Sequence, residues 1–163
     1  MKMIEHEVWI RAEKKQVFDA ITTREGLDAW WGKALTAEPE RDHVVEFDHG
    51  LGEPLRMRST ELNPPQTVTW RCISDFTEPG NPASEWLGHR LHFDLEQGPD
   101  ESTPQWLQDR LGIERGDRFT VLHFRHQGWD ADARWFGFCN CGWGVTLHGL
   151  KRYCEAGNQT GER

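Results

Sequence analysis

Hydrophobic and polar residues alternate over several stretches in the middle of the chain. The alternation is clearest over 86–96, and the residues on its apolar side are Leu87, His89, Leu91, Phe93 and Leu95. A period of two is typical of a strand with one buried face. The same pattern predicts strands over 4–11, 43–48, 55–62, 67–73 and 119–127. Together these segments predict an antiparallel meander with one face covered and the other exposed to water.

The helical period of 3.6 residues is found on both sides of these strands. Residues 14–22 and 24–31 are two short amphipathic segments near the N-terminus, and Gly32 is suited to end the second. A longer segment, 130–156, places its apolar residues on one stripe, which consists of Trp135, Phe136, Cys139, Trp143, Thr146, Leu147, Leu150, Tyr153 and Cys154. The order of elements predicts an α+β fold in which a sheet wraps around one long final helix.

One connection between the predicted strands, residues 98–117, is longer than a hairpin requires. Inside it, Pro104 is suited to the first turn of a helix. Trp106, Leu107 and Leu111 follow at helical spacing and give a short apolar face. We therefore expect an insertion with a small helix of its own.

Length, charge and hydropathy narrow the class of protein. The 163 residues suit a single domain, expected over 1–157, with a polar flexible tail at 158–163. The formal net charge of −8 argues against binding to nucleic acid or to an anionic membrane surface. The chain has no run of about 18 apolar residues, the length that spans a membrane. Its N-terminus lacks the apolar core of a signal peptide, so a cytoplasmic location is expected.

Metal and cofactor chemistry has little support in the sequence. The four cysteines follow no disulfide or zinc spacing, and an intracellular chain keeps them reduced. Cys139 and Cys141 would lie on different sides of a helix, and His123 and His126 on opposite faces of a strand. Neither pair can bind one metal ion, and the chain has no phosphate-binding loop or nucleophile elbow. We expect no cofactor and no metal.

Four segments carry a resemblance to a known family. They are Val8–Ala12 leading into Val17–Thr22, then Leu27–Gly32, His126–Trp129 and Gly142–Tyr153. In these segments and their order the chain resembles the START-like (SRPBCC) superfamily, and within it the group related to the activator of the heat-shock-protein-90 ATPase. The resemblance implies the helix-grip fold, a curved antiparallel sheet of about six to seven strands around a long C-terminal helix. Two short helices are expected after the first strand.

Members of this superfamily bind lipids, hormones and other apolar ligands, act as polyketide cyclases, or regulate chaperones. The resemblance therefore implies a small hydrophobic or aromatic ligand, held in a cavity between the sheet and the last helix. Residues expected to line that cavity are Trp30, Trp31, Phe47, Trp70, His89, Leu91, Phe93, Leu122, Phe124, His126, Trp135, Cys139 and Trp143. Filling of the core is the alternative role for each of them, because apolar rings serve both purposes.

Other functions stay open beside ligand binding. A polyketide cyclase or dehydratase needs a general acid or base, and His126 is the candidate for that role. His89 and His126 are equally consistent with hydrogen bonds inside the core. Of Trp30 and Trp31, one is expected to pack inward and the other to cover a loop or face solvent or ligand. An interaction module, with a chaperone as protein partner, is a further alternative by family analogy, and the sequence does not fix the oligomeric state.

The last predicted helix is unusual because it holds four glycines, Gly137, Gly142, Gly144 and Gly149. Each costs up to about 1 kcal/mol relative to alanine inside a helix. Close packing of the backbone, room for a ligand and a local bend at 142–144 are the explanations that the sequence leaves open.

Overall fold

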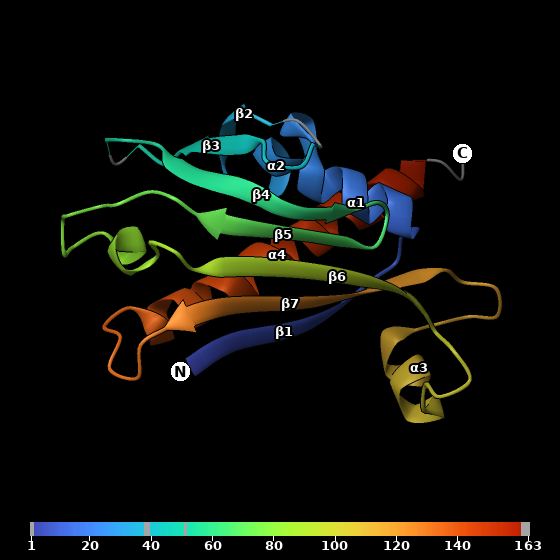
Figure 1. Cartoon of the computed structure of the whole chain (residues 1–163). Coiled ribbons are helices and arrows are strands. Elements are labelled where there is room, and N and C mark those ends of the chain that lie inside the picture. Colours follow the sequence, from blue (N-terminus) through green and yellow to red (C-terminus); the bar gives the residue numbers. More distant parts are fainter. Residues whose placement is uncertain (1, 38–39, 51, 161–163) are drawn as a thin grey trace.

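The computed structural model describes residues 2–37, 40–50 and 52–160, and its central feature is a curved antiparallel sheet of seven strands. The strands are β1 (Lys2–Ile10), β2 (Lys33–Thr36), β3 (Val44–Asp48), β4 (Leu55–Asn63), β5 (Thr67–Cys72), β6 (Arg90–Gly98) and β7 (Phe119–Trp129). The helices are α1 (Lys14–Thr22), α2 (Arg24–Trp30), the 3-10 helix η1 (Pro82–Glu85), α3 (Gln105–Leu111) and α4 (Phe136–Thr160). The sheet wraps around α4, which crosses behind it in Figure 1.

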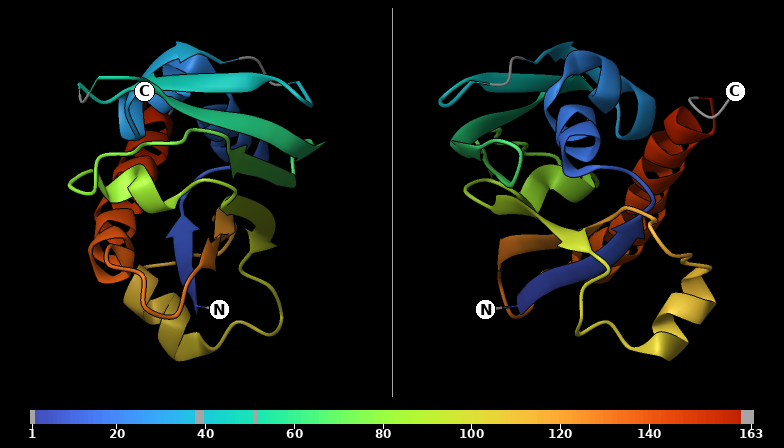
Figure 2. Two further views of the ribbon diagram at one scale, coloured as in Figure 1. Left: turned by 60° about the vertical axis from the view of Figure 1, so that its left-hand side comes forward. Right: turned by 90° about the vertical axis from the view of Figure 1, so that its right-hand side faces the viewer.

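The strands follow the spatial order β1-β7-β6-β5-β4-β3-β2. The first strand of the sequence therefore pairs with the last strand of the sequence. β1 pairs with β7 along its length, with Ile4 opposite His126 and Val8 opposite Leu122. α1 and α2 follow β1 along the chain and close one end of the space between the sheet and α4 (Figure 2). The long final helix is therefore covered on one side by strands and at one end by two short helices.

The concave face of the sheet carries the core. The strand register places Phe93 beside Val68 and Phe124, and Leu91 beside Trp70. All five side chains are buried, and α4 packs its own apolar stripe against them. The period-two strands and the period-3.6 helix therefore meet in one core, as their patterns predict.

Three elements show the largest departures from the prediction. β6 begins at Arg90, later than predicted, because Gly88 takes a positive φ of +81° and turns the chain just before it. Leu87 consequently leaves the apolar face and is 53% exposed, whereas His89 stays buried. β2 has four residues, too few to show a period in the sequence. α4 begins at Phe136 because the residues after β7 form turns before the helix starts.

The long connection between β6 and β7 contains a short helix, α3, as its apolar spacing predicts. Figure 1 shows α3 at the lower right, away from the rest of the molecule, and none of its residues is buried. Arg11 ties this segment to the sheet. Its guanidinium donates to the Asp117 carboxylate at 2.8 Å and to the carbonyl of Gly112 at 3.0 Å.

α4 runs without interruption through Gly137, Gly142, Gly144 and Gly149, the four glycines noted in the sequence, and it also contains Gly157. A Cβ added at Gly144 or Gly149 would lie 3.6 or 3.7 Å from its nearest neighbour, which is an ordinary contact. One added at Gly137 or Gly142 would meet nothing within 4 Å. Close backbone packing therefore requires none of the four, and the helix is not broken at 142–144.

Within the described ranges, no helix combines the length and the apolar character that a membrane span needs. The backbone of α4 continues to Thr160, so the first part of the predicted tail, 158–163, is helical. Residues 161–163 lie outside the described residues.

Candidate functional site

The two consecutive tryptophans at the end of α2 stack on each other, with ring centroids 5.8 Å apart, but differ in exposure. Trp30 is buried, and its indole Nε1 donates to a backbone carbonyl of α1 at 2.8 Å. Trp31 is half-buried and packs on Phe47, Trp70 and Trp143, with ring centroids 4.3, 5.8 and 5.3 Å away. One ring therefore completes the core, and its neighbour covers the core and borders open space.

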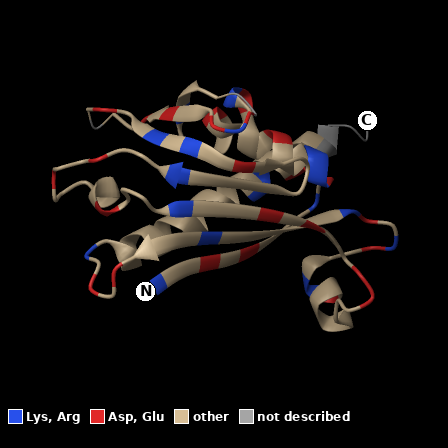
Figure 3. Ribbon diagram, in the orientation of Figure 1, with Lys and Arg blue, Asp and Glu red and all other residues tan. Residues whose placement is uncertain are grey.

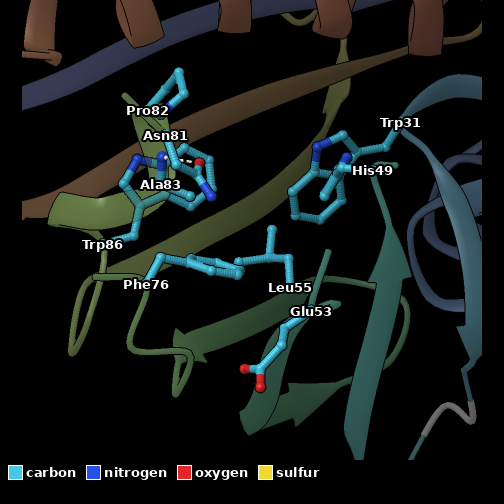
Figure 4. A pocket seen from close by; sticks show the side chains of 9 residues that line it. All are labelled: Trp31, His49, Glu53, Leu55, Phe76, Asn81, Pro82, Ala83 and Trp86. Carbon is cyan, nitrogen blue, oxygen red and sulfur yellow. Dashed lines mark hydrogen bonds between the residues drawn. The ribbon is translucent and has the colours of Figure 1, made fainter. Parts of the chain in front are cut away.

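A pocket of about 320 Å³ opens beside Trp31 (Figure 4). The residues that line it are Trp31, His49, Glu53, Leu55, Phe76, Asn81, Pro82, Ala83 and Trp86. Figure 4 shows Trp31 and Trp86 on opposite sides of the pocket, with Phe76 and Leu55 between them. Its walls are therefore mostly aromatic and aliphatic.

A second pocket of about 150 Å³ adjoins the first, between η1 and α4. The residues that line it are Trp31, Pro82, Trp86, Phe138, Cys139, Gly142, Trp143 and Thr146. Trp31, Pro82 and Trp86 border both pockets, and we name the two together the aromatic cleft. Gly142 contributes no side chain to it, so one glycine of α4 leaves room in the cleft.

Hydrogen bonds to the start of α4 hold the outer wall of the cleft. The carboxylate of Glu85 in η1 accepts two consecutive backbone N–H groups, the second from Trp135 at 2.7 Å. The indole Nε1 of Trp135 donates to the carbonyl of Pro79 at 3.0 Å. The side-chain oxygen of Asn81 accepts the backbone N–H of Ala83 at 2.9 Å and caps η1. Residues 79–85 are thereby fixed against the helix.

Few polar groups face the cleft. Among the residues described as lining it, Glu53 is the one with a formal charge at neutral pH. Burial of part of the ring lowers the pKa of His49, against the opposing effect of Asp48, so this imidazole is neutral at pH 7. Neither ring nitrogen of His49 has a hydrogen-bond partner in the described part of the chain. The ring is therefore free to bind a polar group of a ligand.

A chain of buried hydrogen bonds joins β7 to α4 next to the cleft. The indole Nε1 of Trp143 donates to Nδ1 of His126 at 3.1 Å, and Nε2 of His126 lies 2.9 Å from Nδ1 of His89. Because an indole nitrogen can only donate, Nδ1 of His126 carries no proton. The neutral His126 ring therefore holds its proton on Nε2 and donates it to His89.

Burial keeps both histidines neutral. It lowers the pKa of His126 to about 2, with a smaller effect from the neighbouring His89. The pKa of His89 is also lowered by burial, against the opposing effect of two carboxylates. Gly128, with φ of +113°, makes room for the pair, because a Cβ there would lie 2.6 Å from Cδ2 of His89. His126 thus forms hydrogen bonds with His89 and Trp143 inside the core. It borders neither pocket of the cleft.

The structure divides the thirteen residues predicted to line a cavity. Those that border the aromatic cleft are Trp31, Cys139 and Trp143. Those that are buried between the sheet and α4 are Trp30, Phe47, Trp70, His89, Leu91, Phe93, Leu122, Phe124 and His126. Trp135 lies at the start of α4, where its ring packs on Phe138. Aromatic rings fill the centre of the predicted cavity, so the open space is found at its edge.

Most of the residues that line the larger pocket lie in segments without a periodic signal. Phe76, Asn81 and Ala83 belong to the connection between β5 and β6, which carries the Pro and Gly residues of a loop. Trp86 lies inside a predicted strand but precedes the actual one. Two large rings, Phe76 and Trp86, flank this loop, where no sheet face is available to cover them. Large aromatic residues beside a loop rich in Pro and Gly are therefore the sequence signal that could have located the aromatic cleft.

The cleft offers apolar surface and hydrogen-bonding groups. In the described ranges no group of three or more His, Cys, Asp or Glu is placed to bind a metal ion. Burial raises the pKa of the Cys72 and Cys139 thiols to about 11 and that of Cys154 to about 12. These thiols are protonated at neutral pH and are poor nucleophiles. Cys141 is exposed.

A curved antiparallel sheet that grips a long C-terminal helix, with two short helices after the first strand, defines the helix-grip class of START-like proteins. The predicted fold class is thereby confirmed. The chain belongs to the family described as Activator of Hsp90 ATPase homolog 1-like protein, whose sequence profile matches residues 11–155. This match confirms the resemblance seen in the sequence.

Similar solved structures share this fold. The Aha1 dimer from Colwellia psychrerythraea is 24% identical with a TM-score of 0.72, and the match covers 95% of this chain and 97% of that one. A protein from Bacillus halodurans is 18% identical with a TM-score of 0.69, over 95% and 98% of the two chains. DynU16, a protein of the dynemicin biosynthetic locus, is 16% identical with a TM-score of 0.67, over 96% and 48%. These identities show the fold alone, and no curated protein matches the sequence.

Proposed function

We propose that the protein binds a small, mostly apolar aromatic ligand in the aromatic cleft. The family and the fold support a ligand-binding or polyketide-cyclase-like protein. The observation that carries the proposal is the pair of adjoining pockets, of about 320 and 150 Å³, that Trp31 and Trp86 both border. Small-molecule sites typically have volumes of roughly 300–1,000 Å³ and apolar walls with a few polar groups.

The walls of the cleft favour a flat ligand. Trp31, Phe76 and Trp86 line the larger pocket, and contacts between aromatic rings are worth about 0.5–1.5 kcal/mol beyond the area they bury. His49 and the amide of Asn81 supply hydrogen-bonding groups at the edges (Figure 4). Because the loop that forms the outer wall is already fixed to α4, little ordering is needed on binding.

Substitutions at two glycines of α4 test the site. Leucine at Gly142 would occupy the smaller pocket, whereas leucine at Gly137 would meet open space on the same helix. We expect Gly142→Leu to weaken binding of 1-naphthylmethanol at least about tenfold, which is ~1.4 kcal/mol. Gly137→Leu is the matched control and should bind as the native chain does. Calorimetric titration measures both, and equal affinities for the two variants would contradict the proposal.

A second candidate function, protein interaction, is favoured by the outer face of α4. Phe138 and Val145 are 61% and 71% exposed on this face, and the exposed Cys141 lies one helical turn from each. Residues 135–150 contain no Asp, Glu, Lys or Arg, and Figure 3 shows this part of α4 without charged positions. Each copy has a net charge of −8, so two copies repel each other less across this uncharged face than across the charged parts of the surface. Since the similar Colwellia protein is a dimer, we propose that two copies of this chain meet there.

Light scattering at increasing protein concentration tests the contact between copies. A dimer has twice the chain mass of 19.0 kDa. Val145→Asp should give a monomer, and Leu87→Asp, at an exposed leucine outside α4, should not. Residues near a two-fold axis meet their own copies, so mild oxidation should link two chains through Cys141. A native chain that stays monomeric throughout the concentration series would contradict this candidate.

A chaperone as partner is supported by the family description alone. It predicts that the protein is recovered with the chaperone in a pull-down and raises the chaperone's ATPase rate. Absence of both effects would remove this alternative.

A further inference from the structure

We propose that the aromatic cleft selects aromatic ligands that carry a positive charge, accepts neutral ones and excludes anions. This inference rests on the proposed function and adds the charge of the ligand to it. The preferred ligand is a flat ring that bears a protonated amine or a quaternary ammonium group.

Three aromatic side chains, Trp31, Phe76 and Trp86, line the larger pocket. A cation within about 6 Å of a ring centroid is drawn to the electron-rich face, most strongly to that of Trp. Trp31 stacks on Trp70 at 5.8 Å and 16°, and Trp86 stacks on Trp143 at 6.0 Å and 18°. Because core rings support both tryptophans, their positions are set before a ligand enters.

The charge at the edge of the cleft is negative. Glu53 lies at one edge of the larger pocket and is exposed, and its carboxylate points outward, away from the tryptophan rings (Figure 4). No Lys or Arg is present among the described residues that line either pocket. Arg56 is close enough to interact with the Glu53 charge, but its guanidinium donates to the Glu46 carboxylate at 2.9 Å. The nearest formal charge to a ligand in the larger pocket is therefore negative, and the cation beside it, Arg56, is already paired with Glu46.

The remaining polar groups do not reverse this preference. His49 is neutral at pH 7 because burial lowers its pKa, and the carboxylate of Asp48 precedes it in the chain. An anion entering the cleft would lose hydration without gaining a counter-ion, which is costly. A cation would gain the Glu53 carboxylate and the ring faces, and the net charge of −8 would attract it from a distance. Free fatty acids and acidic aromatic compounds are thus disfavoured.

Three ligands with one ring system test the proposal at pH 7. They are the cation 1-naphthylmethylammonium, the neutral 1-naphthylmethanol and the anion 1-naphthoate, each titrated calorimetrically into the full chain. We expect the cation to bind about three- to tenfold more tightly than the alcohol. Naphthoate should bind at least about tenfold more weakly than the alcohol.

Two charge-matched variants locate the origin of the preference. Glu53→Gln should reduce the difference between the cation and the alcohol, because the ring faces alone then attract the cation. Glu101→Gln removes the same charge from an exposed position in the insertion that holds α3 and should preserve that difference. If both variants reduce the preference equally, it arises from the net charge of the chain, and if neither reduces it, Glu53 does not contribute; either result contradicts the proposal.

The comparison of the three ligands also distinguishes failure of this inference from failure of the proposed function on which it rests. If none of the three compounds binds, the ligand site itself is wrong and the charge preference is wrong with it. If all three bind equally, or naphthoate binds most tightly, the cleft binds ligands and the charge preference alone is overturned.

Discussion

Trp31 and Trp86 border both pockets of the aromatic cleft, the first from the end of α2 and the second from the segment after η1. Each ring also stacks on a buried tryptophan, Trp31 on Trp70 and Trp86 on Trp143. The surface offered to a ligand is therefore continuous with the core. Binding in the cleft should consequently affect the stability of the whole chain.

Ligand binding is expected to raise the melting temperature. A ligand at one hundred times its dissociation constant stabilises the folded chain by about 2.7 kcal/mol. For a chain of this length that corresponds to a rise in Tm of roughly 5–10 °C. Differential scanning calorimetry with 1-naphthylmethanol measures the shift, and Gly142→Leu should show a smaller rise at the same ligand concentration. An equal rise in both proteins would place the ligand elsewhere.

The buried histidines predict a loss of stability in mild acid. His126 has a pKa of about 2 in the folded chain against 6.5 for an unperturbed histidine. The folding stability that depends on the neutral His126 ring is fully present above pH 6.5. It is lost as the pH falls, because the unfolded chain then binds a proton that the folded chain does not. At pH 5 the loss from this group is roughly 2 kcal/mol.

Urea unfolding at pH 7 and pH 5 measures that loss. In His126→Asn the titrating group is gone, so the difference in unfolding free energy between the two pH values should shrink. A native chain with equal stability at both pH values, or a His126 resonance that titrates near pH 6, would show that this ring is accessible to protons. The second result would also restore His126 as a candidate general acid or base.

The glycines predict substitutions of opposite effect. Gly137→Ala and Gly142→Ala should each stabilise the chain by up to ~1 kcal/mol, because the new Cβ meets nothing within 4 Å and alanine favours a helix. Gly128→Ala should destabilise it by more than about 1 kcal/mol, since φ is +113° and the new Cβ would lie 2.6 Å from His89. Chemical denaturation measures all three. Destabilisation by Gly142→Ala would mean that α4 packs more tightly at this position.

The insertion should open locally when its link to the sheet is removed. Asp117 accepts from Arg11 at 2.8 Å and from the backbone of Glu114 at 2.7 Å. We expect Asp117→Ala to speed tryptic cleavage after Arg110 and Arg115 while changing the global free energy of unfolding by less than about 1 kcal/mol. Asp132→Ala, at an exposed aspartate in another turn, should leave the cleavage rate unchanged. Equal cleavage rates for all three proteins would show that other contacts hold the insertion.

The fold could be predicted because its elements obey simple periods. The strands alternate and α4 carries a regular stripe, since each element has one face on the same core. Leu87 departs from its pattern because a positive φ at Gly88, which the alternation does not encode, turns the chain. β2 is too short to carry a pattern.

The site was harder to predict than the fold because identical residue types fill cores and line cavities. Trp30 turns inward through a hydrogen bond from its indole to a carbonyl of α1, a contact between separate elements that spacing does not reveal. Phe76 and Asn81 lie in a loop, where side-chain direction follows from tertiary contacts such as those of Glu85 with the start of α4. Trp31 and Trp143 were predicted as lining residues because their ring types and positions suit either role.

The most direct test of the cleft follows the indole N–H resonances of the nine tryptophans in a two-dimensional NMR titration with 1-naphthylmethanol. The indole signals of Trp31 and Trp86 should shift most and reach saturation together. The signal of Trp106, which is 66% exposed on α3, should stay in place. Saturable shifts confined to other tryptophans, or no saturable shift in any indole signal, would contradict the assignment of the aromatic cleft as a ligand site.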